Sequence, residues 1–235
     1  MSNVKNKISV VSFYLIILLL VSFIGCKNEN LISPESELSK PNNNNVAVSF
    51  FSGSISDINS FNITEAKFVL RQMRLKVSEG ETLADIRMEP FVVNLNLTTH
   101  AVITAAIATI LSGNYHMLKL QIHKPSPQDN ISDPDFMESN RSFSVVVKGF
   151  FNEEPFVFKS AITSARGIII ENSPIFIAPT VLVNFTITLN PYLWFYRSGE
   201  LMNPMNQNNQ HYIDDNIRDS FKRVFRDLDM NGQPD

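Results

Sequence analysis

The sequence has few of the residues from which many functional sites are built. Cys26 is the only cysteine, so an internal disulfide is impossible and a cysteine-based zinc site is excluded. The eight glycines are scattered along the chain and none belongs to a phosphate-binding loop. A serine nucleophile elbow and a paired histidine-glutamate motif are also missing. These absences predict that the protein is not an enzyme.

The four histidines do not form a metal-binding pattern. His116 and His123 lie seven residues apart, so on one strand they would point to opposite faces. A zinc site needs three or four converging ligands. We therefore expect surface or turn positions for all of them, namely His100, His116, His123 and His211.

The charge balance excludes one class of partner. The chain has 20 lysines and arginines against 23 aspartates and glutamates, and the basic residues are not gathered into a stripe. Residues 1–25 hold two lysines and no acid, so their removal changes the net charge from −3 to −5, with 18 basic residues against 23 acidic ones. Nucleic acid is therefore not an expected partner.

The N-terminus has the layout of an export signal. Lys5 and Lys7 precede an apolar run over residues 8–24, and Gly25 supplies a small residue before Cys26. We expect cleavage before Cys26. The alternative is an uncleaved membrane anchor, which is disfavoured because about 17 residues at ~1.5 Å each span ~25 Å, less than the ~30 Å hydrocarbon core.

The residues Phe23-Ile24-Gly25-Cys26 resemble the lipobox of bacterial lipoproteins, with Phe23 where leucine is usual. The resemblance implies acylation of Cys26, which would hold the mature protein on a membrane and would account for a single odd thiol. A lysine at position 27, directly after the cysteine, resembles the pattern of lipoproteins that are sent to an outer membrane. The domain could face the periplasm or the cell surface.

The chain divides into four parts. Residues 1–25 are the expected signal peptide, and residues 26–45 are a tether rich in Ser, Pro, Glu and Asn with too little apolar surface to fold. Residues 46–198 are the expected β domain, and residues 199–235 form a C-terminal segment.

Beyond the tether, apolar and polar residues alternate with a period of two. The clearest case is 181–189, where Val181, Val183, Phe185, Ile187 and Leu189 share one face. Short turns rich in Pro, Gly and Asn separate such segments, which predicts an antiparallel β-sandwich of the immunoglobulin or prealbumin type. Further strands are expected at 46–51, 66–77, 91–97, 115–123, 142–151, 156–163 and 167–171. Residues 101–110 fit a strand or a helical turn.

Tyr115 follows Gly113 at the start of an expected strand. The spacing resembles a tyrosine corner, in which the phenol bonds the backbone a few residues upstream and fixes the chain where it crosses between sheets, with Gly113 supplying the tight turn. The alternative is an ordinary glycine turn before a strand.

A family resemblance rests on the order of the segments around this turn. A leucine-rich strand at 92–97 and a connector at 106–111 precede Ser112-Gly113-Asn114-Tyr115 and a strand at 118–122. The order resembles a family of uncharacterised bacterial lipoprotein β-sandwich domains, whose pattern has Pro-Ala where this chain has Leu111-Ser112. The similarity covers about residues 46–122. It implies a fold and a location but no reaction.

The period changes near the C-terminus. Ile213, Ile217, Phe221 and Phe225 recur every four residues with Val224 beside them, which predicts one amphipathic helix of about four turns.

A possible calcium loop follows this helix. Asp227, Asp229, Asn231 and Asp235 carry oxygen ligands around Gly232, as in the first half of a calcium loop. The bidentate acid expected three residues further on is absent, so calcium would bind weakly. The alternative is a helix C-cap at Asn231 or Gly232 with a solvated tail.

Two other clusters have both a binding and a structural interpretation. The acidic loop 129–138 could hold calcium or a sugar, or could simply be solvated. Trp194-Phe195-Tyr196 could stack on a carbohydrate or pack under the C-terminal helix.

Taken together, these features predict a membrane-anchored, non-catalytic binding or structural module with a protein or a glycan as its partner. Two alternatives stay open: a calcium-binding envelope module, and a carbohydrate-active enzyme whose residues converge only in the fold. A cleft holding Asp133, Asp135 or Glu154 with shifted pKa values would favour the enzyme.

Overall fold

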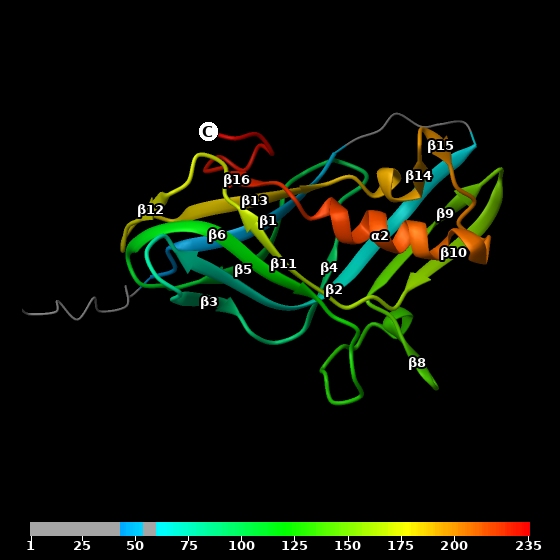
Figure 1. Cartoon of the computed structure of the whole chain (residues 1–235), viewed down its shortest axis with the longest axis horizontal. Coiled ribbons are helices and arrows are strands. Elements are labelled where there is room, and N and C mark those ends of the chain that lie inside the picture. Colours follow the sequence, from blue (N-terminus) through cyan, green and yellow to red (C-terminus); the bar gives the residue numbers. More distant parts are fainter. Residues whose placement is uncertain (1–42, 54–59) are drawn as a thin grey trace, which may run out of the picture. The chain divides into compact units, whose positions relative to one another are not determined.

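The structure, a computed structural model, describes residues 43–53 and 60–235, which fall in one compact unit (Figure 1). The export signal, Cys26 and the tether up to residue 42 lie outside the described residues. No helix within 43–53 and 60–235 is long and apolar enough to cross a membrane. The described chain is mainly β, with one α-helix near its C-terminus, as its sequence predicts.

One sheet has four strands in the order β16-β13-β1-β5. Its central pair is β1 (Val46–Ser52) and β13 (Val183–Leu189). The edges are β5 (Ile103–Ala108) and β16 (Val224–Arg226). The first and the last strands of the described chain therefore lie in the same sheet.

The second sheet is built around β2 (Phe61–Val77), which is long enough to pair with two sets of neighbours. Its first half pairs with β9 and β4, and its second half with β6 and β3. Strand β10 extends the sheet beyond β9, while β11 and β12 both pair with β6. The bounds are β3 (Leu83–Arg87), β4 (Phe91–Asn94), β6 (Gly113–Ile122), β9 (Val145–Phe151), β10 (Glu154–Ser160), β11 (Ser164–Ile169) and β12 (Ile175–Ile177).

Short elements complete the described chain. They are the hairpins β7–β8 (Met137–Glu138, Arg141–Ser142) and β14–β15 (Tyr196–Arg197, Glu200–Leu201), and the 3-10 helices η1 (Pro134–Phe136), η2 (Pro191–Phe195) and η3 (Gln207–Asn209).

Side chains from both sheets meet in one apolar core. Phe50 of β1 and Phe68 of β2 are fully buried and pack edge to face, with ring centres 5.3 Å apart, a favoured aromatic geometry. The other face of β13 is also covered, since Asn184 is buried and donates a hydrogen bond to the carbonyl oxygen of Asp227 at 3.0 Å. The C-terminal segment is therefore an integral part of the fold.

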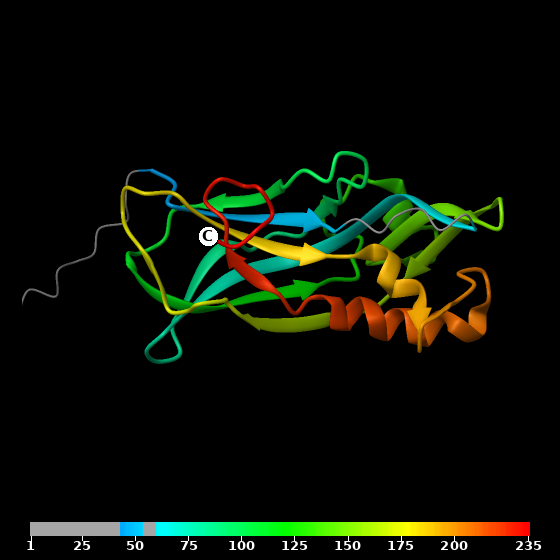
Figure 2. The same cartoon turned by 90° about the horizontal axis from the view of Figure 1, so that it is seen from above.

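The pairing of β1 with β13 differs from the expected antiparallel arrangement. These two strands run parallel, with Val46 opposite Val183 and Ser52 opposite Leu189 (Figure 2). Parallel neighbours need a long crossover connection, and here that connection includes all of the second sheet. Short-range sequence patterns do not contain this information.

The C-terminal helix is shorter than predicted. α2 spans Gln210–Ser220, and Phe225, which continues the four-residue spacing, lies instead in β16 opposite Thr186 of β13. The β preference of Val and Phe and an open edge of β13 outweigh the helical spacing. A helix C-cap at Asn231 or Gly232 was therefore the wrong alternative, because the helix ends at Ser220.

Of the two interpretations of the turn before Tyr115, the tyrosine corner is confirmed. The phenol of Tyr115 donates a hydrogen bond to the carbonyl oxygen of Leu111 at 2.8 Å. Gly113 does not supply a left-handed turn; it begins β6 opposite Ile177. The ambiguous residues 101–110 contain a strand, β5.

Candidate ligand-binding site

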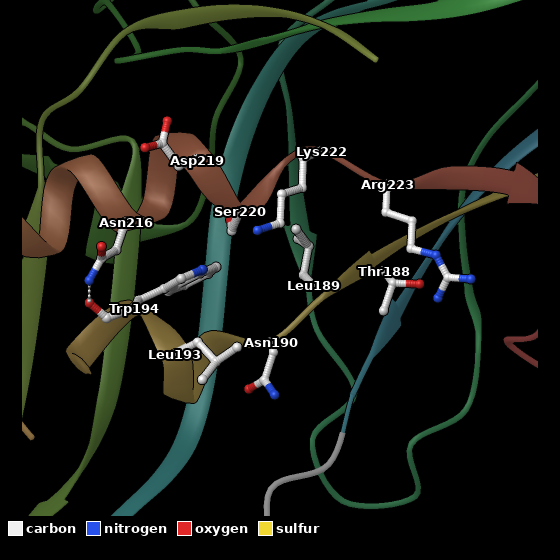
Figure 3. Close-up of a pocket in the computed structure, with 10 residues that line it drawn as sticks. All are labelled: Thr188, Leu189, Asn190, Leu193, Trp194, Asn216, Asp219, Ser220, Lys222 and Arg223. Carbon is white, nitrogen blue, oxygen red and sulfur yellow. Dashed lines mark hydrogen bonds between the residues drawn. The ribbon is translucent and has the colours of Figure 1, made fainter. Parts of the chain in front are cut away.

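A pocket lies where the end of β13, the 3-10 helix η2 and the end of α2 meet (Figure 3). Its volume is about 320 Å³, near the lower end of the range for small-molecule sites. Asn190 caps η2 by accepting a hydrogen bond from the Tyr192 N–H at 3.2 Å, and Pro191 fits the first helical position. This short helix brings Trp194 to the pocket.

Trp194 is firmly held against α2. The amide nitrogen of Asn216 donates hydrogen bonds to the carbonyl oxygens of Trp194 at 2.9 Å and Tyr196 at 2.8 Å. The indole is only 1% exposed, yet its Nε1–H has no hydrogen-bond partner among the described residues. Buried donors are almost always satisfied, so this N–H is an exception among the described residues.

A second polar atom of the pocket wall lacks a partner. Oγ1 of Thr188, on β13, is buried and makes no hydrogen bond within the described part of the chain. Beside it, Leu189 is buried, whereas Leu193 on η2 is 55% exposed. The wall of the pocket is thus largely apolar, as is usual for a small-molecule site.

The charges around the pocket are unevenly paired. Arg223 donates to Glu171 from Nε at 2.7 Å, and this carboxylate raises the pKa of Arg223. Asp219 is paired with Arg166 at 3.2 Å. Lys222 forms no ion pair with a carboxylate of the described chain. Lys222 is exposed, so water solvates its charge.

A second pocket, of about 370 Å³, lies between residues 171–176 and the C-terminal tail. At its edge, Arg226 faces Asp235 at 3.4 Å. Because charges here are paired within the chain, this pocket is the weaker candidate.

The acidic loop 129–138 lines neither of these pockets. Lys67 contacts Asp133 at 2.7 Å and Asp135 at 2.5 Å, and Lys148 also contacts Asp135. Lys67 is 5% exposed; burial alone lowers its pKa, but the hydrogen bonds to both aspartates raise it above its ordinary value. Hydrogen bonds from Lys148 and Lys67 lower the pKa of Asp135.

These contacts form an ion-pair network that joins the loop to β2 and β9. The loop is therefore not simply solvated, so the structural interpretation drawn from the sequence was wrong. The enzyme alternative required a cleft that holds Asp133, Asp135 or Glu154. Instead, Asp133 pairs with Lys67, and Asp135 pairs with Lys67 and Lys148.

Two further residues that the sequence singled out, His123 and Asp129, contact each other. His123 is buried, not at the surface, and its Nε2 lies 2.8 Å from Asp129. Burial raises the pKa of Asp129, but hydrogen bonds from Ser126 and His123 outweigh this effect and lower it. Within the described residues, no group of three or more His, Cys, Asp or Glu could hold a metal ion.

The loop predicted to bind calcium folds against β13. Asp227 is fully buried and accepts hydrogen bonds from Thr186 Oγ1 at 2.7 Å and from the N–H of Asn231 at 3.0 Å. Asp229 and Asp235 accept further hydrogen bonds within the loop. Calcium binding stays a prediction, and the ion would have to compete with these bonds.

The sequence indicated Trp194 but not its place at a pocket. The indole packs beside α2, as one of its two interpretations proposed, and its burial leaves no free face for stacking on a sugar. Thr188 and Lys222 carried no signal, because only the turn from α2 into β16 brings Lys222 next to the end of β13. An unsatisfied indole nitrogen cannot be recognised without the fold.

The sequence matches no protein-family model and no curated protein. Among solved structures, the chain is similar to MbnP from Methylosinus trichosporium, with 8% sequence identity and a TM-score of 0.40. The match covers 63% of this chain and 76% of that chain. A similarity this low does not transfer a function.

Proposed function

We propose that this chain is a lipid-anchored protein of the bacterial cell envelope whose folded part is a non-catalytic module that binds a small ligand in the Trp194 pocket. The observation that supports it most is the pocket itself, which has a volume of about 320 Å³ and is lined by the buried Trp194 and the exposed Leu193. The partner is a free small molecule, or a sugar unit or side chain presented by a glycan or a protein.

The finer fold assignment belongs to this proposal. A β-sandwich of the immunoglobulin or prealbumin type is supported by two sheets that share one core and by the bond from Tyr115 to Leu111. The parallel pair β1–β13 is a departure from the simplest form of such a sandwich.

The non-catalytic assignment is supported by the residues that line the pocket. Asp219 is the one carboxylate there, and it is paired with Arg166. Glycoside hydrolysis generally needs two carboxyl groups that flank the bond to be cleaved. The Trp194 pocket has no such pair.

The lipid anchor is proposed from the sequence alone, on the signal layout that ends at Cys26. Mass spectrometry of the protein extracted from bacterial membranes tests it. We expect a chain that begins at an acylated Cys26, and Cys26→Ser should release the protein from the membrane fraction. An intact Met1 or a free thiol at Cys26 would contradict the anchor.

The pocket is tested by soaking crystals of the domain with a library of small fragments. We expect bound fragments in the Trp194 pocket, in contact with the exposed Leu193. Fragments that gather elsewhere and leave this pocket empty would contradict the proposal.

A further inference from the structure

We propose that the end of the domain at which the described chain begins rests on the lipid surface that holds the anchor. The contact is made by a group of exposed apolar side chains, which we call the entry rim: Leu111, Val181 and Leu182, with Ile107 and Phe176 beside them. This inference rests on the lipid anchor of the proposed function and adds how the anchored domain is oriented on its membrane.

Two loops surround the start of β1, and Asn45 joins them. The Asn45 side chain is fully buried, and its amide nitrogen donates to the carbonyl oxygens of Ile110 and Ala178, both at 3.1 Å. Its amide oxygen accepts a hydrogen bond from the N–H of Ile110 at 2.9 Å. The loop between β5 and β6 and the loop between β12 and β13 are therefore fixed next to the point where the described chain begins.

The side chains of the entry rim project into solvent although they are apolar. All five are between 43% and 60% exposed. Single exposed apolar residues are common on protein surfaces and need no explanation. Here, Leu111 and the pair Val181-Leu182 lie on the two loops that Asn45 joins, so they form one surface at one end of the domain.

The segments that form this end carry no charge. Residues 43–52, 101–115 and 172–196 contain no Asp, Glu, Lys or Arg. The hairpins at the opposite end of the domain, β9–β10 and β14–β15, instead expose acidic side chains at their turns (Figures 1 and 2). A surface without charged groups enters the boundary of a bilayer at little cost in hydration.

Acidic residues occur beside the rim, in the turn between β2 and β3. Ser78 of this turn donates from its N–H to the carbonyl oxygen of Asn114 at 2.8 Å, and Glu81 pairs with Lys76 at 2.8 Å. Because the rim itself offers no cation, we expect anionic lipids to add nothing to the contact.

The N-terminal chain determines which surface the rim meets. Residues 27–42 are 16 residues that join Cys26 to Asn43, and such a chain spans at most about 55 Å. An acylated Cys26 therefore holds this end of the domain close to lipid. An apolar surface held there gains free energy by entering the bilayer boundary. Since the rim is small compared with the acyl chains, it orients the domain, whereas the anchor retains the protein.

A fluorescent label at the rim tests this orientation in the lipidated protein. Cys26 is the only cysteine and the anchor occupies its thiol, so one introduced cysteine takes the label. Thr180→Cys places the label on an exposed residue next to Val181. Val157→Cys, at an exposed position of β10 near the opposite end, is the matched control (Figure 1).

The protein is reconstituted into phosphatidylcholine vesicles that contain a lipid with a spin label on its acyl chain, which quenches labels that enter the bilayer. We expect the label of Thr180→Cys to be quenched about fivefold more strongly than that of Val157→Cys. Neither 0.5 M salt nor added anionic lipid should change this ratio, because the contact is apolar.

Substitutions in the rim separate its effect from that of the anchor. The combined variant Leu111→Ser, Val181→Ser and Leu182→Ser should lower the ratio of docked to undocked domain about tenfold, as measured with the same label. The combined variant Phe150→Ser, Val157→Ser and Ile169→Ser removes three exposed apolar side chains elsewhere and should leave the ratio unchanged.

The outcomes distinguish the rim from the anchor. Equal quenching of the two labels, or an equal effect of the two combined variants, overturns the rim and leaves the anchor in place. A label at position 180 that shifts to the blue as protein density rises, without quenching by lipid, means that a second copy covers the rim and also overturns the inference. A free thiol at Cys26 overturns the anchor, and this inference with it.

Discussion

Lys67→Met should destabilise the fold by breaking the ion-pair network under the acidic loop. The side chain of Lys67 is 7% exposed and contacts Glu65 at 3.4 Å, Asp133 at 2.7 Å and Asp135 at 2.5 Å. Methionine preserves most of the apolar stem and removes the charge. The variant therefore leaves three carboxylates facing one another with Lys148 as their remaining partner.

The size of the effect follows from burial. Removing one partner of a fully buried ion pair costs about 3–5 kcal/mol. The carboxylates here keep side-chain exposures of 24–28%, so water screens part of the repulsion and we expect a loss of about 2 kcal/mol in the free energy of unfolding. For a domain of this size, this corresponds to a decrease of about 4–8 °C in Tm.

Lys148→Met is the matched control. Lys148 contacts Glu65 at 2.9 Å and Asp135 at 2.5 Å, but its side chain is 34% exposed. We expect a loss below about 1 kcal/mol for this variant. The difference in stability loss between the two variants measures the effect of burial, because both remove one lysine from the same cluster.

The assay is urea unfolding followed at several pH values. Because lysine contacts lower the pKa of Asp135, the stability that it contributes is present above its unfolded pKa of about 3.9 and is lost as pH falls through the folded value. The difference in the free energy of unfolding between wild type and Lys67→Met should therefore be largest near neutral pH and should disappear in acid. Equal losses for both variants, or a gap that does not change with pH, would refute this reasoning.

Three further outcomes are expected. Tyr115→Phe removes the bond to Leu111 at 2.8 Å and should cost about 1 kcal/mol in chemical unfolding; an unchanged midpoint would mean that the corner contributes nothing. Gly149→Ala should prevent folding or destabilise it severely, because a Cβ would collide with the backbone of Asn62, whereas Gly167→Ala meets only the flexible side chain of Met117 and should be tolerated; circular dichroism of the two variants distinguishes them, and similar behaviour would contradict the close approach. The calcium alternative predicts that calorimetry with and without calcium shows stabilisation of wild type and a smaller effect in Asp229→Ala; a wild-type protein that does not respond would remove this alternative.

Local signals predicted much of the fold. The alternation in 181–189 correctly indicated a strand, but β13 begins at Val183, Val181 is exposed, and the polar face with Asn184 and Thr186 is buried too. Tyr115 and its neighbours predicted a specific hydrogen bond, because that motif is contained within five residues. Short strands such as β3 and β12 were missed, since three to five residues carry too little pattern to be distinguished from a loop.

Interactions over long sequence distances could not be predicted. The helical spacing of Phe221 and Phe225 was misleading, because the open edge of β13 that captures β16 is formed by residues about 40 positions earlier. The same limit applies to the pocket. Trp194, Thr188 and Lys222 come from three elements, and no pattern in the chain indicates that they meet.

Since β1 pairs with β13 and β13 pairs with β16, the four-stranded sheet cannot close until almost the whole polypeptide is available. A chain that threads N-terminus first through a membrane would deliver β1 well before its partners, so its apolar face would wait unpaired. For the export route proposed above, the four-stranded sheet would therefore be completed only after β13 and β16 have crossed.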